Sequence, residues 1–335
     1  MATSRILVTG GAGFMGSWLA DELLRRNHEV IVVDNLFGGK EENVNRGCKF
    51  VKADLRDRRQ VDSIVGSGVD TIFHLAAYAA EGQSIFSPIS INEINIAPMN
   101  NLLVAAVNND VKRFVFTSSM AAYGDQTPPF SENLPRQPED PYGAAKAYCE
   151  NMLEIFERAH GLEYVIVRPH NVYGARQNIS DPYRNVLGIW INRIMRGKEP
   201  LIYGDGEQKR AFSCIEDVTP ALANAGFYAG AQGQIINLGS DEVVTINEAC
   251  KLLVGLYGTE LKPRHVPERP SEVKYAYSTV DKSIKLLDYK TQFPLREGLK
   301  EMIEWAKKKG PQEPTYMLPL EITKNAPQVW VERAI

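Results

Sequence analysis

The sequence has few cysteines and histidines and no long hydrophobic run. Its cysteines, Cys48, Cys149, Cys214 and Cys250, are far apart and form no C-x-x-C pair. This spacing argues against a zinc site and against a disulfide framework, and it is typical of proteins of the reducing cytoplasm. The five histidines show no metal-ligand spacing. We therefore expect a cytoplasmic protein without a bound metal.

The chain also lacks the features of membrane and nucleic-acid-binding proteins. No apolar run approaches the ~20 residues that a membrane-spanning helix needs, and the first residues contain no long apolar segment of the kind found in secretory signals. The formal net charge is only −3, so we expect neither a nucleic-acid nor a membrane partner. With 335 residues, of which 44% are hydrophobic, the chain is long enough for two packed lobes.

Short β-branched runs alternate with helical stretches in the first half of the chain. Strands are expected at 6–9, 30–34, 49–52, 71–75, 113–118 and 164–168, and helices at 16–26, 58–65, 94–108 and 144–160. This alternation predicts a parallel sheet with helices on both faces, which is a doubly wound α/β fold. After Pro169 the elements become shorter and less regular, which predicts a smaller α/β lobe over the carboxyl edge of the sheet.

The strongest local signal is the glycine-rich segment Thr9–Gly16, which follows the first expected strand and opens the first expected helix. It satisfies both G-x-G-x-x-G and G-x-x-G-x-x-G. Glycines let the backbone turn sharply and approach a pyrophosphate, and the amides at the start of the helix then bind the phosphates. On its own the pattern would indicate only a tight turn, but its strand–turn–helix context predicts a dinucleotide site in a Rossmann fold.

The second expected strand ends at Asp34, where the type of dinucleotide is selected. A carboxylate at this place accepts hydrogen bonds from the adenosine ribose and repels a 2′-phosphate. No arginine occurs in 35–39 to attract that phosphate. The sequence therefore predicts NAD rather than NADP as the cofactor.

The predicted domain division follows from these patterns. The expected parts are a dinucleotide-binding domain at 1–175 with a returning segment around 212–240, an interleaved substrate lobe at 176–211 and 241–309, and a tail at 310–335. The returning segment is expected because 234–238 has the pattern of a further strand of the main sheet. The tail has no clear periodicity, and it could be a surface strap, an oligomer contact or a partly disordered segment.

Tyr142 and Lys146 stand four positions apart at the start of an expected helix and therefore share one face. About one Tyr-x-x-x-Lys match is expected by chance in a chain of this composition, so the two residues taken alone could be an ordinary surface pair. Ser118 and Ser119, however, follow a strand at the sheet edge where ligands bind in open α/β folds. Tyr142 could take the proton of a carbinol hydroxyl, with Lys146 lowering its pKa from ~10. Ser119 could hold the same hydroxyl in line.

Together these segments resemble the extended short-chain dehydrogenase/reductase superfamily, and within it the NAD-dependent nucleotide-sugar epimerases and dehydratases. The resemblance covers about residues 5–305 and is greatest to the UDP-glucose 4-epimerase branch. The matching segments are Thr9–Gly16, Asp34-Asn35, Ala53–Leu55, His74–Ala77, Thr117–Ser119, Tyr123-Gly124, Tyr142–Lys146, Arg168–Gly174, Tyr203–Gly206, Arg210 and Arg269-Pro270.

The resemblance implies a set of binding residues. Cofactor contacts are implied for Gly10, Gly13, Phe14, Met15, Gly16, Asp34, Asn35, Asp54, Leu55, Leu75, Ala76, Ala77, Asn95, Ser118, Tyr142, Lys146 and Pro169. Substrate contacts are implied for Ser119, Asn171, Asn185, Tyr203, Arg210 and Arg269. The two arginines would clamp the substrate diphosphate, because guanidinium groups match phosphate oxygens. Either arginine taken singly could equally be a solvated surface charge.

The type of reaction depends on the two residues after Ser119. In the related 4,6-dehydratases an Asp-Glu pair at this place supplies the base and the acid that elimination of water needs. Here the positions hold Met120 and Ala121. We therefore expect a 4-epimerase that inverts C4 of a nucleotide-diphosphate hexose, of the UDP-glucose and UDP-galactose type, through a transient 4-keto intermediate.

Other functions remain open on the same scaffold. A dehydratase could use another carboxylate, such as Glu81, as its acid or base. A UDP-glucuronate 4-epimerase would act on a different sugar from the one expected above. An NAD-binding redox sensor is disfavoured because the chain keeps both Tyr142 and Lys146. The expected partner is a nucleotide-diphosphate sugar, with UDP as the nucleotide. The resemblance also implies a homodimer formed through the helices after Asn95 and Tyr142.

Overall fold

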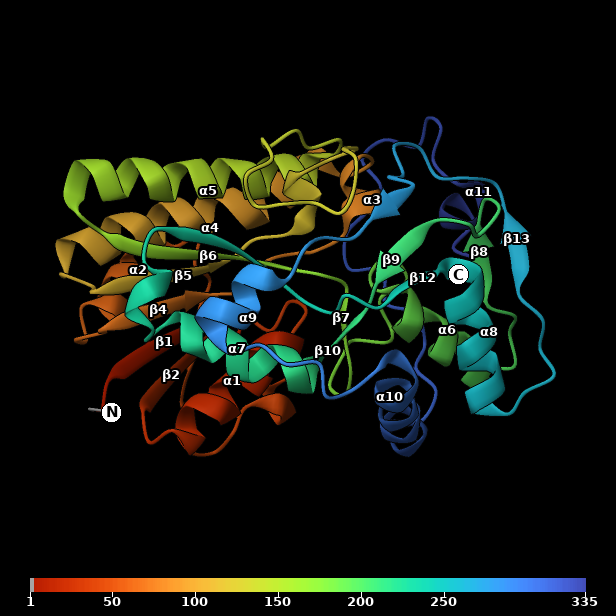
Figure 1. The fold of residues 1–335 in the computed structure, drawn as a ribbon, viewed down its shortest axis with the longest axis horizontal. Helices are drawn as coiled ribbons and strands as arrows, with labels where there is room; N and C mark the ends of the chain where they lie inside the picture. The colour runs from red at the N-terminus through yellow and green to blue at the C-terminus, as the bar shows by residue number, and fades with distance from the viewer. Residues whose placement is uncertain (1–2) are drawn as a thin grey trace.

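A seven-stranded parallel sheet occupies the left part of the molecule in Figure 1. The computed structural model describes residues 3–335. The strands are β1 (Arg5–Thr9), β2 (Glu29–Asp34), β3 (Lys49–Lys52), β4 (Thr71–His74), β5 (Arg113–Thr117), β6 (Glu163–Pro169) and β11 (Gln234–Leu238). Their order is β11-β6-β5-β4-β1-β2-β3, and all neighbours are parallel. The winding reverses between β1 and β4, which confirms the predicted doubly wound Rossmann sheet.

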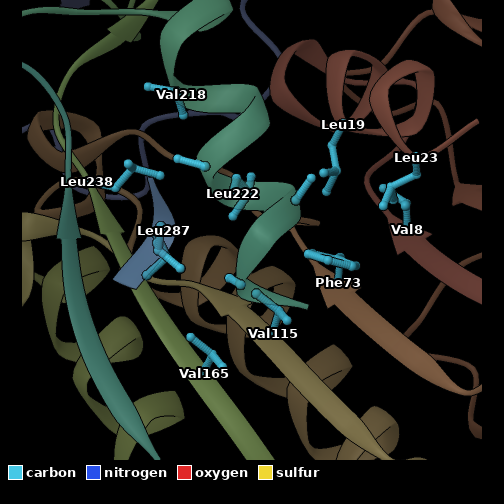
Figure 2. Close-up of a cluster of buried hydrophobic side chains, with 14 of the residues drawn as sticks. Val8, Leu19, Leu23, Phe73, Val115, Val165, Val218, Leu222, Leu238 and Leu287 are labelled. Carbon is cyan, nitrogen blue, oxygen red and sulfur yellow. The ribbon is translucent and has the colours of Figure 1, made fainter. Parts of the chain in front are cut away.

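Helices cover both faces of this sheet (Figure 1). The layer on one face consists of α2 (Arg58–Val65), α4 (Pro88–Asn108) and α5 (Pro141–His160), and the layer on the other of α1 (Phe14–Arg25), α7 (Ile215–Ala225) and α9 (Asp281–Leu287). Figure 2 shows Leu19 and Leu222 of the second layer close to Phe73 and Val115 of the strands. Because both faces are buried, the strands read as continuous apolar runs rather than as alternating ones.

The smaller lobe lies on the right of Figure 1. It contains β7 (Val172–Tyr173), α6 (Val186–Met195), β8 (Leu201–Tyr203), β9 (Lys209–Ala211), β10 (Ser213–Cys214), β12 (Val243–Thr245), α8 (Ile246–Tyr257), β13 (Arg264–Val266), β14 (Tyr275–Ala276) and α10 (Leu295–Lys309). Trp190 of α6 is buried in the core of this lobe and donates a hydrogen bond to the Leu201 carbonyl at 2.7 Å. The chain leaves the lobe to form β11 beside β6, where the sequence predicted a returning strand.

Three helices begin earlier than the sequence indicated: α1 by two residues, and α5 and α4 by more, each of the latter two with a physical cause. α5 begins at Pro141, because the first turn of a helix tolerates proline: amides there have no partner within the helix. The Asp140 side chain caps this start by accepting a hydrogen bond from the Gly143 amide at 2.9 Å. α4 begins at Pro88, six residues before the predicted start. Its first amides, Ile89 and Ser90, donate to the Glu321 carboxylate at 2.9 and 2.8 Å. Glu321 lies in the tail, so no local pattern could reveal this cap.

The tail after α10 folds back over the boundary between the sheet and the smaller lobe, as a strap. Its backbone joins both parts: Thr315 donates to the Ser180 carbonyl at 2.8 Å, and the Pro319 carbonyl accepts from Ser87 at 2.8 Å. Trp330, in the short helix α11 (Gln328–Val331), is buried. The structure therefore shows a surface strap, and an oligomer contact of the tail stays a prediction.

A buried ion cluster joins α5 to the sheet. The Glu150 carboxylate is fully buried and accepts two hydrogen bonds from Arg168 of β6, at 2.8 and 2.5 Å. It also accepts one from the Ser118 hydroxyl at 2.5 Å and one from Arg136 at 2.5 Å. Burial alone would raise the pKa of Glu150, but the hydrogen bonds and charges of these partners outweigh it and lower the pKa.

We expect the Glu150→Gln substitution to destabilise the protein by about 3–5 kcal/mol, because it leaves the Arg168 charge buried without a partner. Glu154→Gln is the matched control, since Glu154 pairs with Arg136 near the surface and its loss should cost less than about 1 kcal/mol. Urea unfolding of the two variants measures both free energies. Equal, small losses would show that the buried pair contributes little.

Candidate active site

A cavity of about 660 Å³ lies between the carboxyl edge of the sheet and the smaller lobe. Its position at the reversal between β1 and β4 is where open α/β sheets bind their ligands, and its volume is that of a small-molecule site. Every predicted cofactor and substrate residue except Asn95 lines it. The structure thus brings together groups that are as far apart in the chain as Gly10 and Arg269.

Asn95 differs from the expectation of a direct cofactor contact. Its side chain is buried, accepts a hydrogen bond from the Tyr78 amide at 2.9 Å and donates one to the Tyr78 carbonyl at 3.2 Å. The amide is therefore occupied in holding the segment after β4, which includes the cavity-lining Leu75 and Ala77. In this structure Asn95 supports the cavity wall and does not line the cavity.

The glycine-rich turn packs directly on the end of β4. Gly10 has φ of 67°, and a Cβ atom at this position would lie 2.8 Å from the Ala76 backbone. A Cβ on Gly16 would collide with the Gly10 carbonyl. Only glycine therefore allows the turn to approach β4 while its backbone and that of Gly13 remain open to the cavity, as a pyrophosphate requires.

Asp34 ends β2 at the cavity wall. Its two carboxylate oxygens accept hydrogen bonds from the Ala12 amide at 3.1 Å and the Leu36 amide at 2.8 Å. Burial raises its pKa, and these backbone amides partly oppose that shift. Nearby, Arg56 lowers the pKa of Asp54 to about 2 by hydrogen bonding to it. Arg56, which also lines the cavity, is thus already paired, and the group of residues fits the ribose and adenine of NAD.

We expect Asp34→Ala to weaken NAD binding and to relax the discrimination against NADP, because the variant loses both the ribose acceptor and the negative charge. Asp34→Asn keeps a side chain able to bond the ribose and should lose mainly the discrimination. Calorimetry with NAD and NADP on the three proteins measures this. Tighter binding of NADP than of NAD by the unaltered protein would contradict the assignment.

Ser119, Tyr142 and Lys146 all line the cavity wall. All three are buried. The Lys146 ammonium donates to the Thr117 carbonyl at 2.8 Å and lies 5.7 Å from the centroid of the Tyr142 ring. Burial lowers the pKa of Lys146 to about 8. The ammonium is therefore held at the end of β5, beside the phenol.

The pKa of Tyr142 is shifted in the direction opposite to that needed in a base. Burial raises it, and the negative charge of Glu81 raises it further, while the hydrogen bond with Ser119 acts in the opposite direction. The protein alone therefore keeps the phenol protonated. A positive charge beside the ring would reverse this shift, and NAD⁺ supplies both that charge and a hydride acceptor when it is bound.

We expect Tyr142→Phe to lower kcat by roughly 10²–10⁴-fold, the range for loss of a general acid or base. Ser119→Ala should lower kcat less, because the serine orients the hydroxyl without taking its proton. Steady-state kinetics measures both, with thermal melting as the control for folding. Near-normal turnover of a folded Tyr142→Phe enzyme would remove Tyr142 from the chemistry.

The other end of the cavity contains two arginines around one carboxylate. Arg269 donates two hydrogen bonds to Glu272, at 3.0 and 2.8 Å, and Arg210 lies 3.6 Å from the same carboxylate. The Arg269 guanidinium also lies 4.9 Å from the centroid of the Tyr203 ring. The Tyr203 hydroxyl in turn accepts a hydrogen bond from the Trp330 indole at 2.7 Å. The sequence missed Glu272, whose only signal was its spacing of three from Arg269, and Trp330, which had none.

Asn171 and Asn185 line the cavity between its two ends. Both have positive φ, of 32° and 45°. Asn171 donates to the Ala211 carbonyl at 3.1 Å, and Asn185 caps α6 by accepting from the Leu187 amide at 3.2 Å. These bonds fix both side chains at the wall. Their binding of a diphosphate stays a prediction.

The chain belongs to the NAD dependent epimerase/dehydratase family, whose model matches residues 6–239. NAD is accordingly its cofactor. A UDP-glucose 4-epimerase from Thermotoga maritima, solved with UDP-glucose, is 36% identical with a TM-score of 0.86, over 91% of this chain and 99% of that one. A UDP-glucose 4-epimerase from Thermus thermophilus, solved with NAD, is 32% identical with a TM-score of 0.84, over 90% and 98% of the two chains.

A third relative has a different activity. The UDP-N-acetyl-alpha-D-glucosaminuronate decarboxylase of Bacillus cytotoxicus is 32% identical over 319 residues, which are 90% of this chain and 97% of that protein. Relatives of similar identity thus include epimerases and a decarboxylase. Membership of the family establishes the fold and the cofactor, but the reaction has to be inferred from the residues in the cavity.

Proposed function

We propose that the protein is a nucleotide-sugar 4-epimerase that inverts C4 of a UDP-hexose of the glucose and galactose type. The observation that carries this proposal is the identity of the two residues that follow Ser119 after the end of β5, Met120 and Ala121. Met120 is buried in an apolar cluster with Tyr123 and Phe130. Neither side chain can donate or accept a proton, so elimination has no acid–base pair at this place.

The positions of the side chains support the order of events. Tyr142 removes the C4 hydroxyl proton while Ser119 holds that hydroxyl, and bound NAD⁺ would supply the acceptor and the source of the C4 hydride. Tyr142 gives its proton back after the 4-keto sugar has turned its other face to the cofactor. Few fixed hydrogen bonds to the ring would favour this turn, and Arg210 and Arg269 would keep the intermediate attached through its diphosphate.

A dehydratase is the second candidate, because one carboxylate does face the cavity. Glu81 lines it near Tyr142, and desolvation followed by the charge of Asp140 raises the pKa of Glu81 to about 7. A group with that pKa could serve as an acid or a base in an elimination. The epimerase is preferred because elimination needs two such groups at C5 and C6.

Assembly and location stay predictions. Among residues 3–335 no helix is long and apolar enough to cross a membrane. Separately, we propose that the enzyme is cytoplasmic. We also propose a homodimer through α4 and α5, which pack against each other and expose Ile89, Tyr148 and Ile155.

The proposal is tested by supplying UDP-glucose, UDP-galactose, their N-acetyl forms and UDP-glucuronate with NAD⁺ and following the products by NMR. We expect at least one of these sugars to interconvert with its C4 epimer, without net formation of NADH. Accumulation of a 4-keto-6-deoxy sugar would show a dehydratase, and equal conversion of free galactose would remove the role of the diphosphate.

A further inference from the structure

One carboxylate in the cavity has no role in the reaction as proposed. Glu81 is the first residue of the short helix α3 (Glu81–Ser84), directly after the segment that lines the cofactor side of the cavity. It also borders a small adjoining hollow that is lined by Asp140, Arg210 and Arg269. Glu81 is exposed within these spaces, so its carboxylate is accessible to a ligand.

Two neighbouring carboxylates are already paired, whereas Glu81 is not. Asp140 accepts a hydrogen bond from the Gly143 amide at 2.9 Å and lies 3.0 Å from the Ser84 hydroxyl, and Glu272 accepts both bonds of Arg269. Desolvation and the charges of Asp140, Arg210 and Arg269 act on the Glu81 carboxylate, but among residues 3–335 no hydrogen bond to it is found. The oxygens of the Glu81 carboxylate therefore remain available to a ligand.

Glu81 lies between the two ends of the substrate site. At one end it is the charged group with the largest effect on Tyr142. At the other end it feels the charges of Arg210 and Arg269. A Cβ atom on the adjacent Gly82 would lie 3.4 Å from an Arg269 nitrogen and 3.1 Å from the Trp330 ring. In a nucleotide-diphosphate hexose, C4 and the diphosphate-bearing C1 lie at opposite sides of the ring. A substrate with C4 at Tyr142 and its diphosphate at the arginines must therefore place its ring beside Glu81.

We propose that Glu81 selects the sugar: its carboxylate accepts hydrogen bonds from the hydroxyls of a neutral hexose and repels a sugar that carries a carboxylate at C6. The proposal rests on the function proposed above and adds that the substrates are neutral hexoses rather than uronates. Placing a charge against the wrong ligand is a common source of specificity, and it acts strongly where water is partly excluded.

The Glu81 segment is held in a fixed position, as a selecting group requires. The Ser84 hydroxyl lies within 2.6 Å of the Glu81 carbonyl, to which it donates, and within 3.0 Å of the Asp140 carboxylate. Trp330 of the tail closes the other side of Gly82. The backbone that carries the Glu81 side chain can therefore move little away from a second negative charge.

The test compares the binding of UDP, UDP-glucose and UDP-glucuronate to the NAD-loaded full-length protein by calorimetry at pH 8, where Glu81 is ionised. Glu81→Gln keeps the shape and an acceptor oxygen but removes the charge. We expect it to bind UDP-glucuronate at least tenfold more tightly than the unaltered protein does, to bind UDP-glucose more weakly, and to bind UDP equally well. Glu139→Gln is the matched control, because Glu139 is an exposed carboxylate that borders the adjoining hollow but does not line the main cavity, where the sugar ring would lie. The preference of this variant between the two sugars should be unchanged.

An unchanged ratio of UDP-glucose to UDP-glucuronate affinity in Glu81→Gln would overturn this proposal alone. So would loss of turnover on every sugar with binding intact, because it would make Glu81 a proton-transfer group. Failure of the unaltered protein to bind UDP would instead overturn the proposed function, and with it the role of Glu81.

Discussion

The active site depends on one buried carboxylate. Tyr142, Lys146 and Glu150 follow each other at intervals of four on α5, so they lie on one face of the helix. Glu150 binds Arg168 of β6 and Ser118 at the end of β5, which fixes the rotation of α5 against the two strands. This single contact thereby sets Ser119, Tyr142 and Lys146 at the same edge of the sheet. A carboxylate in such a place is costly unless every partner is present, so the geometry is specified as well as stabilised.

The electrostatics of the cavity divides it into three regions. At one end of the cavity Asp34 supplies a negative acceptor, and at the other end Arg210 and Arg269 supply positive charge around Glu272. Between them, burial and Glu81 hold Tyr142 in its neutral form. The chemistry would therefore begin only after the positively charged cofactor is bound, which links the presence of NAD⁺ to removal of the substrate proton.

The sequence predicted what is encoded by short-range pattern. The glycine turn, Asp34 at the end of a strand and the Tyr142–Lys146 spacing each concern a few consecutive residues, and the structure places them as expected. The sequence pattern could not predict contacts between residues far apart in the chain. Glu321 caps a helix more than two hundred residues earlier, and Trp330, in a tail without periodicity, donates a hydrogen bond to the Tyr203 hydroxyl. For Asn95 the resemblance implied a cofactor contact, whereas the amide is occupied by Tyr78.

The central claim is that C4 of the sugar gives up a hydride and takes the same hydride back. It is tested most directly with a UDP-hexose that carries deuterium at C4, converted in ordinary water and analysed by mass spectrometry and NMR. The mechanism predicts that the C4 epimer keeps the whole label at C4, because the hydride never exchanges with solvent. Loss of the deuterium to water, or its appearance at C6 of a deoxy sugar, would contradict it.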